Sequence, residues 1–145
     1  RRFEKKGVTK NGATVYDDYA HHPTAIRETL AAAREKFPEK KIVVAFHPHL
    51  YSRTRDLFEG FVAELAKADS IILVPIYPAR ENPIPGITSD ALADAIRKTN
   101  PQVRSLHTFE DIERDLRGAS PSDLIITMGA GDIYKVADAL VSTQE

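Results

Sequence analysis

Two kinds of hydrophobic pattern alternate along the chain. Continuous apolar runs at 42–46, 71–76 and 124–128 predict strands that are buried on both faces, as in a parallel sheet. Longer segments place apolar residues three or four positions apart, which predicts amphipathic helices. These periodic segments lie at 23–37, 57–65, 89–96, 108–116 and 133–141.

The start of the chain predicts a hairpin. Residues 2–8 form the candidate edge strand, 10–12 carry an Asn-Gly turn signal, and 13–17 form the strand that follows. A further short strand is expected at 102–107. Strands that alternate with helices imply right-handed crossovers. We therefore predict one α/β domain over 1–145, with three α/β/α layers and a mostly parallel, Rossmann-like sheet. Helices cover both faces, and the hairpin adds an N-terminal edge strand.

Composition narrows the functional classes. The 145 residues are 42% hydrophobic and 28% charged, which is typical of a soluble domain with a substantial core. The net charge of -1 argues against a basic nucleic-acid surface, so any anion site must be local. The chain has no cysteine and no apolar run near the roughly 18 residues of a membrane span, so we expect a cytoplasmic protein without a membrane partner. It opens on Arg1 rather than methionine, and we expect a fragment of a longer polypeptide.

Polar residues gather where the predicted strands end. The segments that leave the strands are 17–22, 47–55, 77–80 and 129–132. Because the carboxyl ends of parallel strands meet at one edge of the sheet, we expect four loops to converge where α/β proteins bind ligands. Pro23 fits the first turn of a helix, whose free N–H groups add a preference for an anion.

The first loop admits structural and functional interpretations. Asp17 or Asp18 can hold the loop by accepting backbone N–H groups, and His21 and His22 can cap the helix. Two imidazoles beside two carboxylates nevertheless favour a site, because histidine titrates near neutrality and carboxylates bind metals or ribose hydroxyls.

The second loop also has competing interpretations. His47 and His49, as alternate residues leaving a strand, can chelate a metal, but Arg53 and Arg55 would repel a cation. A guanidinium holds a carboxylate or phosphate through two parallel hydrogen bonds, so the arginines predict an anion instead. Arg55 can equally lie on a solvated helix face.

The two remaining loops carry weaker signals. The turn at 129–131, Gly-Ala-Gly before a helix, resembles a phosphate-approach turn, but it lacks a full dinucleotide fingerprint and the lysine of a P-loop. A tight strand-to-helix turn needs the same glycines. Residues 77–86 contain three prolines and form either a stiff connection or the rim of a pocket.

Four motifs together resemble the carboxy-terminal domain of the Mur ligases. They are Tyr16-Asp17-Asp18-Tyr19-Ala20-His21-His22-Pro23-Thr24, His47-Pro48-His49-Leu50-Tyr51-Ser52-Arg53-Thr54, Ile76-Tyr77-Pro78-Ala79-Arg80-Glu81 with Pro83-Ile84-Pro85-Gly86, and Met128-Gly129-Ala130-Gly131-Asp132-Ile133. They cover nearly the whole chain in the expected order. Within the family the second motif is similar to that of the member that joins L-alanine to UDP-N-acetylmuramate, and it differs from that of the tripeptide-recycling member.

The resemblance implies an ATP-dependent ligase of peptidoglycan precursor synthesis. ATP phosphorylates the muramate carboxylate, the amine of L-alanine attacks the acyl phosphate, and phosphate leaves. By the same resemblance Asp18 contacts the nucleotide, while Tyr19 and His21 line the site between nucleotide and amino acid. His49 and Arg53 hold the alanine carboxylate. No residue of this domain is implied as catalytic or as a metal ligand.

Two features limit what the resemblance implies. Leu50 stands where some relatives carry a second arginine, which leaves fewer charges for the carboxylate. The P-loop and the main ligands of ATP and Mg²⁺ belong to N-terminal and central domains outside this chain, so we expect the isolated domain to be inactive.

Two other functions stay open from the sequence. One is a small metal-dependent hydrolase that uses the four histidines of the two loops with Asp17 or Asp18, namely His21, His22, His47 and His49. The other is a free-standing module that binds a small anion.

Overall fold

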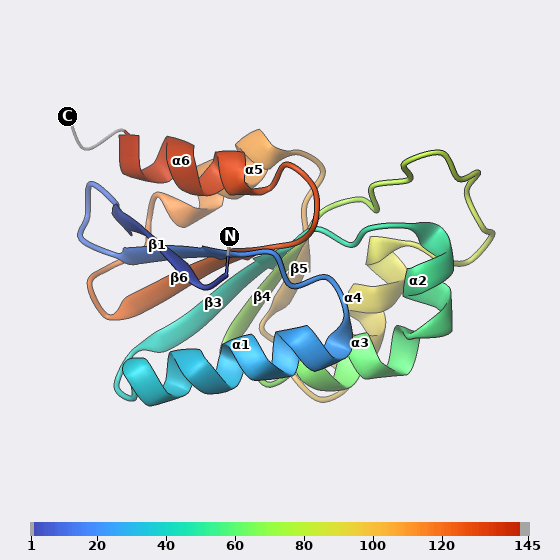
Figure 1. Ribbon diagram of the computed structural model, residues 1–145, viewed down its shortest axis with the longest axis horizontal. Coiled ribbons are helices and arrows are strands. Elements are labelled where there is room, and N and C mark those ends of the chain that lie inside the picture. Colours follow the sequence, from blue (N-terminus) through green and yellow to red (C-terminus); the bar gives the residue numbers. More distant parts are fainter. Residues whose placement is uncertain (1, 143–145) are drawn as a thin grey trace.

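A six-stranded sheet forms the middle layer of the protein, which the computed structural model describes over residues 2–142 (Figure 1). Its order is β1-β2-β6-β3-β4-β5; β1 pairs with β2 antiparallel, and every other pair is parallel. The mostly parallel sheet with an N-terminal edge hairpin is therefore confirmed. The strands are β1 Glu4–Val8, β2 Thr14–Asp18, β3 Lys41–Phe46, β4 Ser70–Leu73, β5 Val103–Ser105 and β6 Asp123–Met128.

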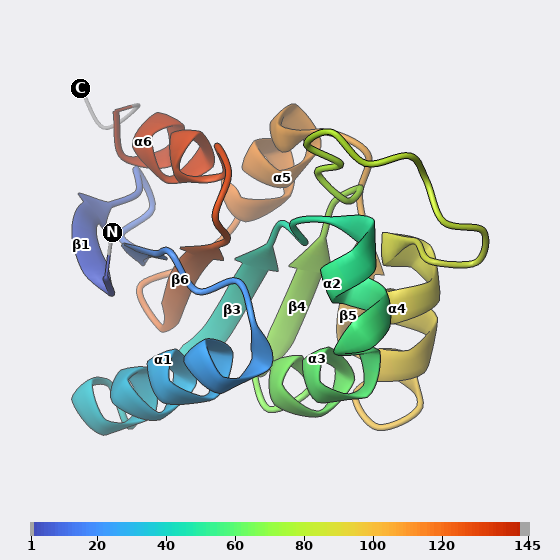
Figure 2. The same cartoon turned by 45° about the vertical axis from the view of Figure 1, so that its right-hand side comes forward.

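Helices cover both faces of this sheet, as predicted. Figures 1 and 2 show α1, α3 and α4 on one face and α5 with α6 on the other. This arrangement is the expected three-layer architecture. The helices are α1 Pro23–Lys36, α2 Tyr51–Asp56, α3 Phe58–Leu65, α4 Ser89–Arg97, α5 Phe109–Leu116 and α6 Tyr134–Ser142.

The continuous apolar runs of the central strands supply two hydrophobic cores. In β3, Ile42, Val44 and Phe46 join the core under α1, α3 and α4, whereas Val43 and Ala45 join the core under α5 and α6. Successive side chains of a strand point to opposite faces, so a strand between two helical layers must be apolar at nearly every position. This requirement explains why these runs do not alternate with polar residues.

Helix α2 lies where the sequence pattern predicted only a loop. Of its side chains only that of Thr54 is buried. A six-residue helix with one buried position has no apolar stripe, so hydrophobic periodicity could not reveal it. The consequence is that Arg53 and Arg55 lie on a helix directly before α3.

Two strand boundaries also differ from the prediction. β4 ends at Leu73 rather than Ile76, and Pro75, which has no N–H to donate to the ladder, follows this end. The backbone of 74–76 continues without ladder pairing, although Ile76 remains buried. β5 is confined to the middle of the predicted segment.

The cap of α4 differs by one residue from the obvious reading. Ser89 is the first helical residue, and its hydroxyl donates to the carbonyl of Val74. Thr88 is the cap, and its Oγ1 accepts a 3.0 Å hydrogen bond from the amide of Ala91. Thr108 caps α5, and its Oγ1 accepts a 3.0 Å hydrogen bond from the amide of Asp111.

Candidate functional site

The loops that follow β2, β6, β3 and β4 meet at one edge of the sheet, as the strand polarity required (Figure 2). Backbone hydrogen bonds join them pairwise. The amide of Gly129 donates to the backbone carbonyl of Asp18 over 3.2 Å, and the amide of His47 donates to the backbone carbonyl of Met128 over 2.9 Å. The amide of Leu50 donates to Tyr77 over 2.8 Å. The loops therefore form one continuous surface.

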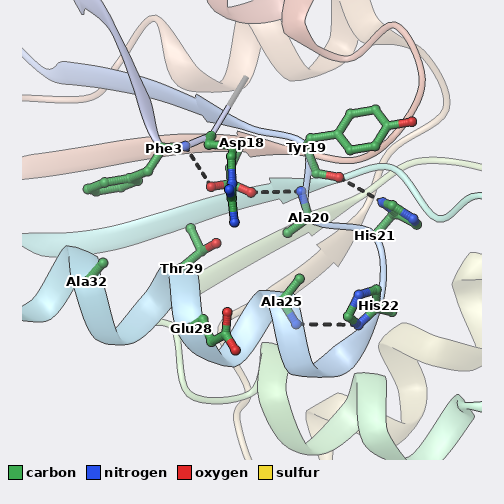
Figure 3. A pocket seen from close by; sticks show the side chains of 11 residues that line it. Phe3, Asp18, Tyr19, Ala20, His21, His22, Ala25, Glu28, Thr29 and Ala32 are labelled. Carbon is green, nitrogen blue, oxygen red and sulfur yellow. Dashed lines mark hydrogen bonds between the residues drawn. The ribbon is translucent and has the colours of Figure 1, made fainter.

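The two aspartates of the first loop both make internal hydrogen bonds. Asp17 is fully buried, and its Oδ1 accepts a 2.6 Å bond from the hydroxyl of Thr127. Asp18 accepts the amide of Phe3 on one carboxylate oxygen and the amide of Ala20 on the other, each over 2.7 Å (Figure 3). The structural interpretation thus holds for both residues, and Asp18 fastens the N-terminal segment to the loop.

Beside Asp18 lies a cavity of about 410 Å³ between the end of β2 and the first turns of α1 (Figure 3). Tyr19, with 47% of its surface exposed, lines it together with His21. Neither His49 nor Arg53 belongs to its wall. The lining residues are Arg2, Phe3, Asp18, Tyr19, Ala20, His21, His22, Ala25, Glu28, Thr29 and Ala32.

The adjacent histidines of this loop have different roles. His22 caps α1, because its Nδ1 accepts from the amide of Ala25 over 3.4 Å. His21 lies with its Nδ1 2.9 Å from the carbonyl of Tyr19 and therefore donates that proton. Its ring meets that of Tyr19 edge-on, with centroids 5.0 Å apart. Both rings line the cavity, and each uses its Nδ1 in these hydrogen bonds.

His47 belongs to the packed interior. Its ring lies edge-on to Phe109 at 5.3 Å, and it forms a hydrogen bond with the backbone of Pro75. Since proline has no N–H, the ring is the donor, and its Nδ1 is buried without a hydrogen-bond partner among residues 2–142. Burial, followed by the proximity of His49, lowers the pKa of His47 to about 4. The ring is therefore neutral near pH 7.

The glycine turn after β6 is shaped by this histidine. Gly129 has φ +150°, and a Cβ on it would lie 2.9 Å from the carbonyl oxygen of His47. A Cβ on Gly131 would lie 3.6 Å from the His47 Nδ1. The close approach of two chain segments accounts for Gly129, which favours the packing interpretation there, whereas a Cβ on Gly131 would make only an ordinary contact.

His49, Arg53 and His21 interact electrostatically at this edge of the sheet. Burial lowers the pKa of His49, Arg53 and then His21 lower it further, and Glu81 opposes them. The Arg53 Nη1 donates to the carbonyl of His49 over 3.2 Å, and no carboxylate within residues 2–142 pairs with this guanidinium. Arg55 differs, because it is exposed and pairs with Asp56 over 2.8 Å. The solvated-face interpretation agrees with the exposure of Arg55, whereas Arg53 is half-buried.

The loop after β4 contributes two residues that the sequence reasoning did not select. Tyr77 lies edge-on to His49 with ring centroids 5.2 Å apart, and its amide donates to Pro48 over 2.9 Å. Glu81 accepts hydrogen bonds from Ser52. The start of 77–86 is therefore part of the site surface. The sequence signal that could have identified these two residues is that both lie within the motif at 76–81.

The comparisons with known proteins decide the family. Residues 1–131 match the family described as "Mur ligase, glutamate ligase domain". The chain belongs to the Mur ligase family. It is 49% identical over 139 residues to the UDP-N-acetylmuramate–L-alanine ligase of Clostridium tetani, which covers 95% of this chain and 30% of that protein. This Mur ligase domain thus spans about a third of the length of the curated relatives it matches.

Solved structures of the Mur ligase family share the fold. The UDP-N-acetylmuramate-alanine ligase MurC of Thermotoga maritima aligns with a TM-score of 0.79 and 26% identity, over 99% of this chain and 29% of that one. A domain assigned to a UDP-N-acetylmuramate:L-alanyl-γ-D-glutamyl-diaminopimelate ligase of Haemophilus ducreyi aligns with a TM-score of 0.71 and 27% identity, over 99% of this chain and all of that one.

Family membership gives no support to the hydrolase or to the free-standing binding module. Across residues 2–142 no three His, Cys, Asp or Glu side chains are grouped so that they could hold a metal ion. His22 and His47 are used for capping and packing, and Asp17 bonds to a threonine. In that same part of the Mur ligase domain, no helix is long and apolar enough to cross a bilayer.

Proposed function

We propose that this chain is the amino-acid- and nucleotide-closing C-terminal domain of an ATP-dependent ligase that joins L-alanine to UDP-N-acetylmuramate in peptidoglycan precursor synthesis. The observation that carries the proposal is the Arg53 guanidinium, which donates to the backbone carbonyl of His49 and has no carboxylate partner among the described residues. An amino-acid carboxylate is the group that such a guanidinium binds through two parallel hydrogen bonds. The identity of 49% to a ligase of that name supports the choice of substrates.

We also propose that residues 1–145 form one domain and that N-terminal and central domains of the same polypeptide complete the enzyme. The curated relatives are about three times longer than this chain, and the Haemophilus ducreyi domain matches it from end to end. The substrates of the proposed reaction are small cytoplasmic molecules, so we place the enzyme in the cytoplasm. The isolated domain should be inactive.

The site residues then divide by position. Arg53 and His49 hold the carboxylate of L-alanine, and His21 with Tyr19 lies between that carboxylate and the cavity beside α1. Asp18 lines the cavity, and each of its oxygens keeps a second lone pair for a donor on the nucleotide. The nucleotide thus lies along the β2 loop and the amino acid along the β3 loop.

ATP and Mg²⁺ enter this proposal through the rest of the enzyme. The residues present in 2–142 do not form a metal site, so the groups that hold Mg²⁺ lie mainly outside this domain. The domain itself supplies orientation: it fixes the carboxylate of alanine, which places the amine for attack on the acyl phosphate. Such alignment of charged partners is a large part of catalysis in this type of transfer.

The direct test is Arg53→Ala in the complete enzyme, with Arg55→Ala as a control of equal charge change from the same helix. Loss of a charge-assisted pair at a desolvated position costs about 2–5 kcal/mol of binding, so KM for L-alanine should rise at least about 30-fold. Arg55→Ala should leave it nearly unchanged. An unaltered KM in the Arg53 variant would show that the carboxylate is bound elsewhere.

A further inference from the structure

Helix α2 begins without a cap of its own. Its preceding residue, Leu50, has φ 76° and ψ 134° and gives no side-chain hydrogen bond to the helix. The first N–H groups of any helix have no partner within the helix, so they need acceptors from elsewhere. This need is acute here because a short helix has few internal hydrogen bonds to keep it in place.

Glu81 provides the missing acceptors from a distant part of the chain. Its Oε1 accepts the amide of Ser52 over 3.0 Å, and its Oε2 accepts the Ser52 hydroxyl in a short hydrogen bond. The amide of Tyr51 also bonds to Glu81. The hydrogen bonds from Ser52 lower the pKa of Glu81, so the carboxylate is ionised and its charge faces the positive end of the helix.

The same loop holds the start of α2 at a second point. The amide of Leu50 donates to Tyr77 over 2.8 Å, and the amide of Tyr77 donates to Pro48 over 2.9 Å. The backbone at Tyr77 and the carboxylate of Glu81 thus brace residues 48–52 from one side. Arg53 is the next residue, and its guanidinium reaches back to the carbonyl of His49 in the braced segment.

We propose that Glu81 is a positioning residue for recognition of the amino-acid carboxylate: it holds the first turn of α2 so that Arg53 and His49 keep their relative placement. This proposal rests on the proposed function. Glu81 acts through Ser52 and does not itself hold the carboxylate of the amino acid, because its negative charge would repel that group.

The experiment uses the complete ligase with Glu81→Ala and Glu81→Gln, and with Glu59→Gln as the charge-matched control. Glu59 is an exposed glutamate in the first turn of the next helix, α3. Loss of a helix cap predicts a rise of about fivefold to thirtyfold in KM for L-alanine for Glu81→Ala. Glu81→Gln keeps one acceptor oxygen, so its KM for L-alanine should lie between that of Glu81→Ala and that of the unmodified enzyme. KM for ATP and for UDP-N-acetylmuramate, and kcat at saturating alanine, should stay within about twofold.

A double-mutant cycle tests the route through Ser52. Ser52→Ala alone should raise KM for L-alanine by less than Glu81→Ala, and the double variant should raise it no further than Glu81→Ala does. Fully additive effects would contradict the proposal, since Glu81 would then act on the amino acid independently of α2. Equal increases in KM for all three substrates would also contradict it, because they indicate general disruption of the domain.

The outcome for Arg53 separates this inference from the proposed function. If Arg53→Ala raises KM for L-alanine and neither Glu81 variant does, the positioning role is wrong and the proposed function stands. If Arg53→Ala leaves KM unchanged as well, the assignment of the alanine carboxylate to this surface fails, and the role of Glu81 fails with it.

Discussion

In the sequence, the segments at the ends of β2 and β3 both contain several ionisable residues. In the structure these residues differ in their hydrogen-bond partners. At the end of β2 and in the loop that follows it, Asp17, Asp18 and His22 each form a hydrogen bond within the domain. In the β3 loop, Arg53 has a backbone carbonyl, that of the half-buried His49, as its hydrogen-bond partner within residues 2–142. A dense cluster of ionisable residues therefore locates the ligand-binding edge without saying which of its members bind.

The difference has a simple physical origin. The β2 loop must connect a buried strand to a helix in four residues, 19–22, and its acceptors satisfy the amides that this sharp connection exposes. The β3 loop continues into α2. This helix places Arg53 away from the sheet, on a turn whose first residues form hydrogen bonds with Glu81. We therefore expect stability to depend on the first loop and substrate affinity on the second.

The largest effect expected on stability is that of Asp18→Ala. This change removes two short hydrogen bonds from backbone amides to a buried carboxylate and releases the segment at Phe3. Bonds to charged groups contribute about 1.5–3 kcal/mol each, so the free energy of unfolding should fall by about 3–6 kcal/mol in urea titrations of this chain. Glu28→Ala, an exposed carboxylate on the same cavity wall, is the control and should change it by less than about 0.5 kcal/mol. A small loss of stability in Asp18→Ala would show that these two hydrogen bonds contribute little to folding and that Asp18 serves mainly to contact the ligand.

Much of this fold could be predicted from the sequence because it depends on patterns among neighbouring residues. The apolar runs of β3 and β6, the spacing of the long helices and the threonine cap at Thr108 each follow from a few neighbouring residues. Strand polarity then brings the four loops to one edge without further information. That Arg53 binds an anion stays a prediction, and it rests on chemistry that is intrinsic to the side chain.

The remaining features depend on contacts between distant residues. Asp18 finds its partner at Phe3, 15 residues away, and Ser52 finds Glu81, 29 residues away. No local pattern encodes which acceptor will meet which amide. The choice between Thr88 and Ser89 as a cap is similar, because both carry a hydroxyl and only the backbone path decides which one faces the helix.

The second effect is a loss of stability in acid that comes from His47. Its pKa is lowered to about 4 in the folded chain against 6.5 for an ordinary histidine, so between these values the unfolded chain binds a proton that the folded chain does not. The contribution of His47 to the free energy of unfolding is therefore fully present above pH 6.5 and is lost as the pH falls from 6.5 toward 4. Below pH 4 this group causes no further loss of stability. The full loss is roughly 3 kcal/mol.

Urea titrations at several pH values measure this loss. His47→Gln should flatten the curve between pH 6.5 and 4, although it also lowers stability at neutral pH by disturbing the packing on Phe109. His107→Gln, at an exposed position, should leave the acid dependence in place. If the curve keeps its slope in His47→Gln, protons bound at other sites cause the loss.

The smallest effect on stability is predicted at the residue with the largest predicted effect on substrate affinity. Arg53→Ala removes one long hydrogen bond, 3.2 Å, from a half-exposed guanidinium to a backbone carbonyl and no ion pair with any residue of 2–142, so the free energy of unfolding should change by no more than about 1 kcal/mol. The same variant in the complete enzyme should still raise KM for L-alanine. A group that is optional for folding and needed for binding is what a ligand clamp requires, because its hydrogen-bonding capacity must remain open until the ligand arrives. Destabilisation by several kcal/mol would instead make Arg53 a structural residue like Asp18, and the contrast between the two loops would disappear.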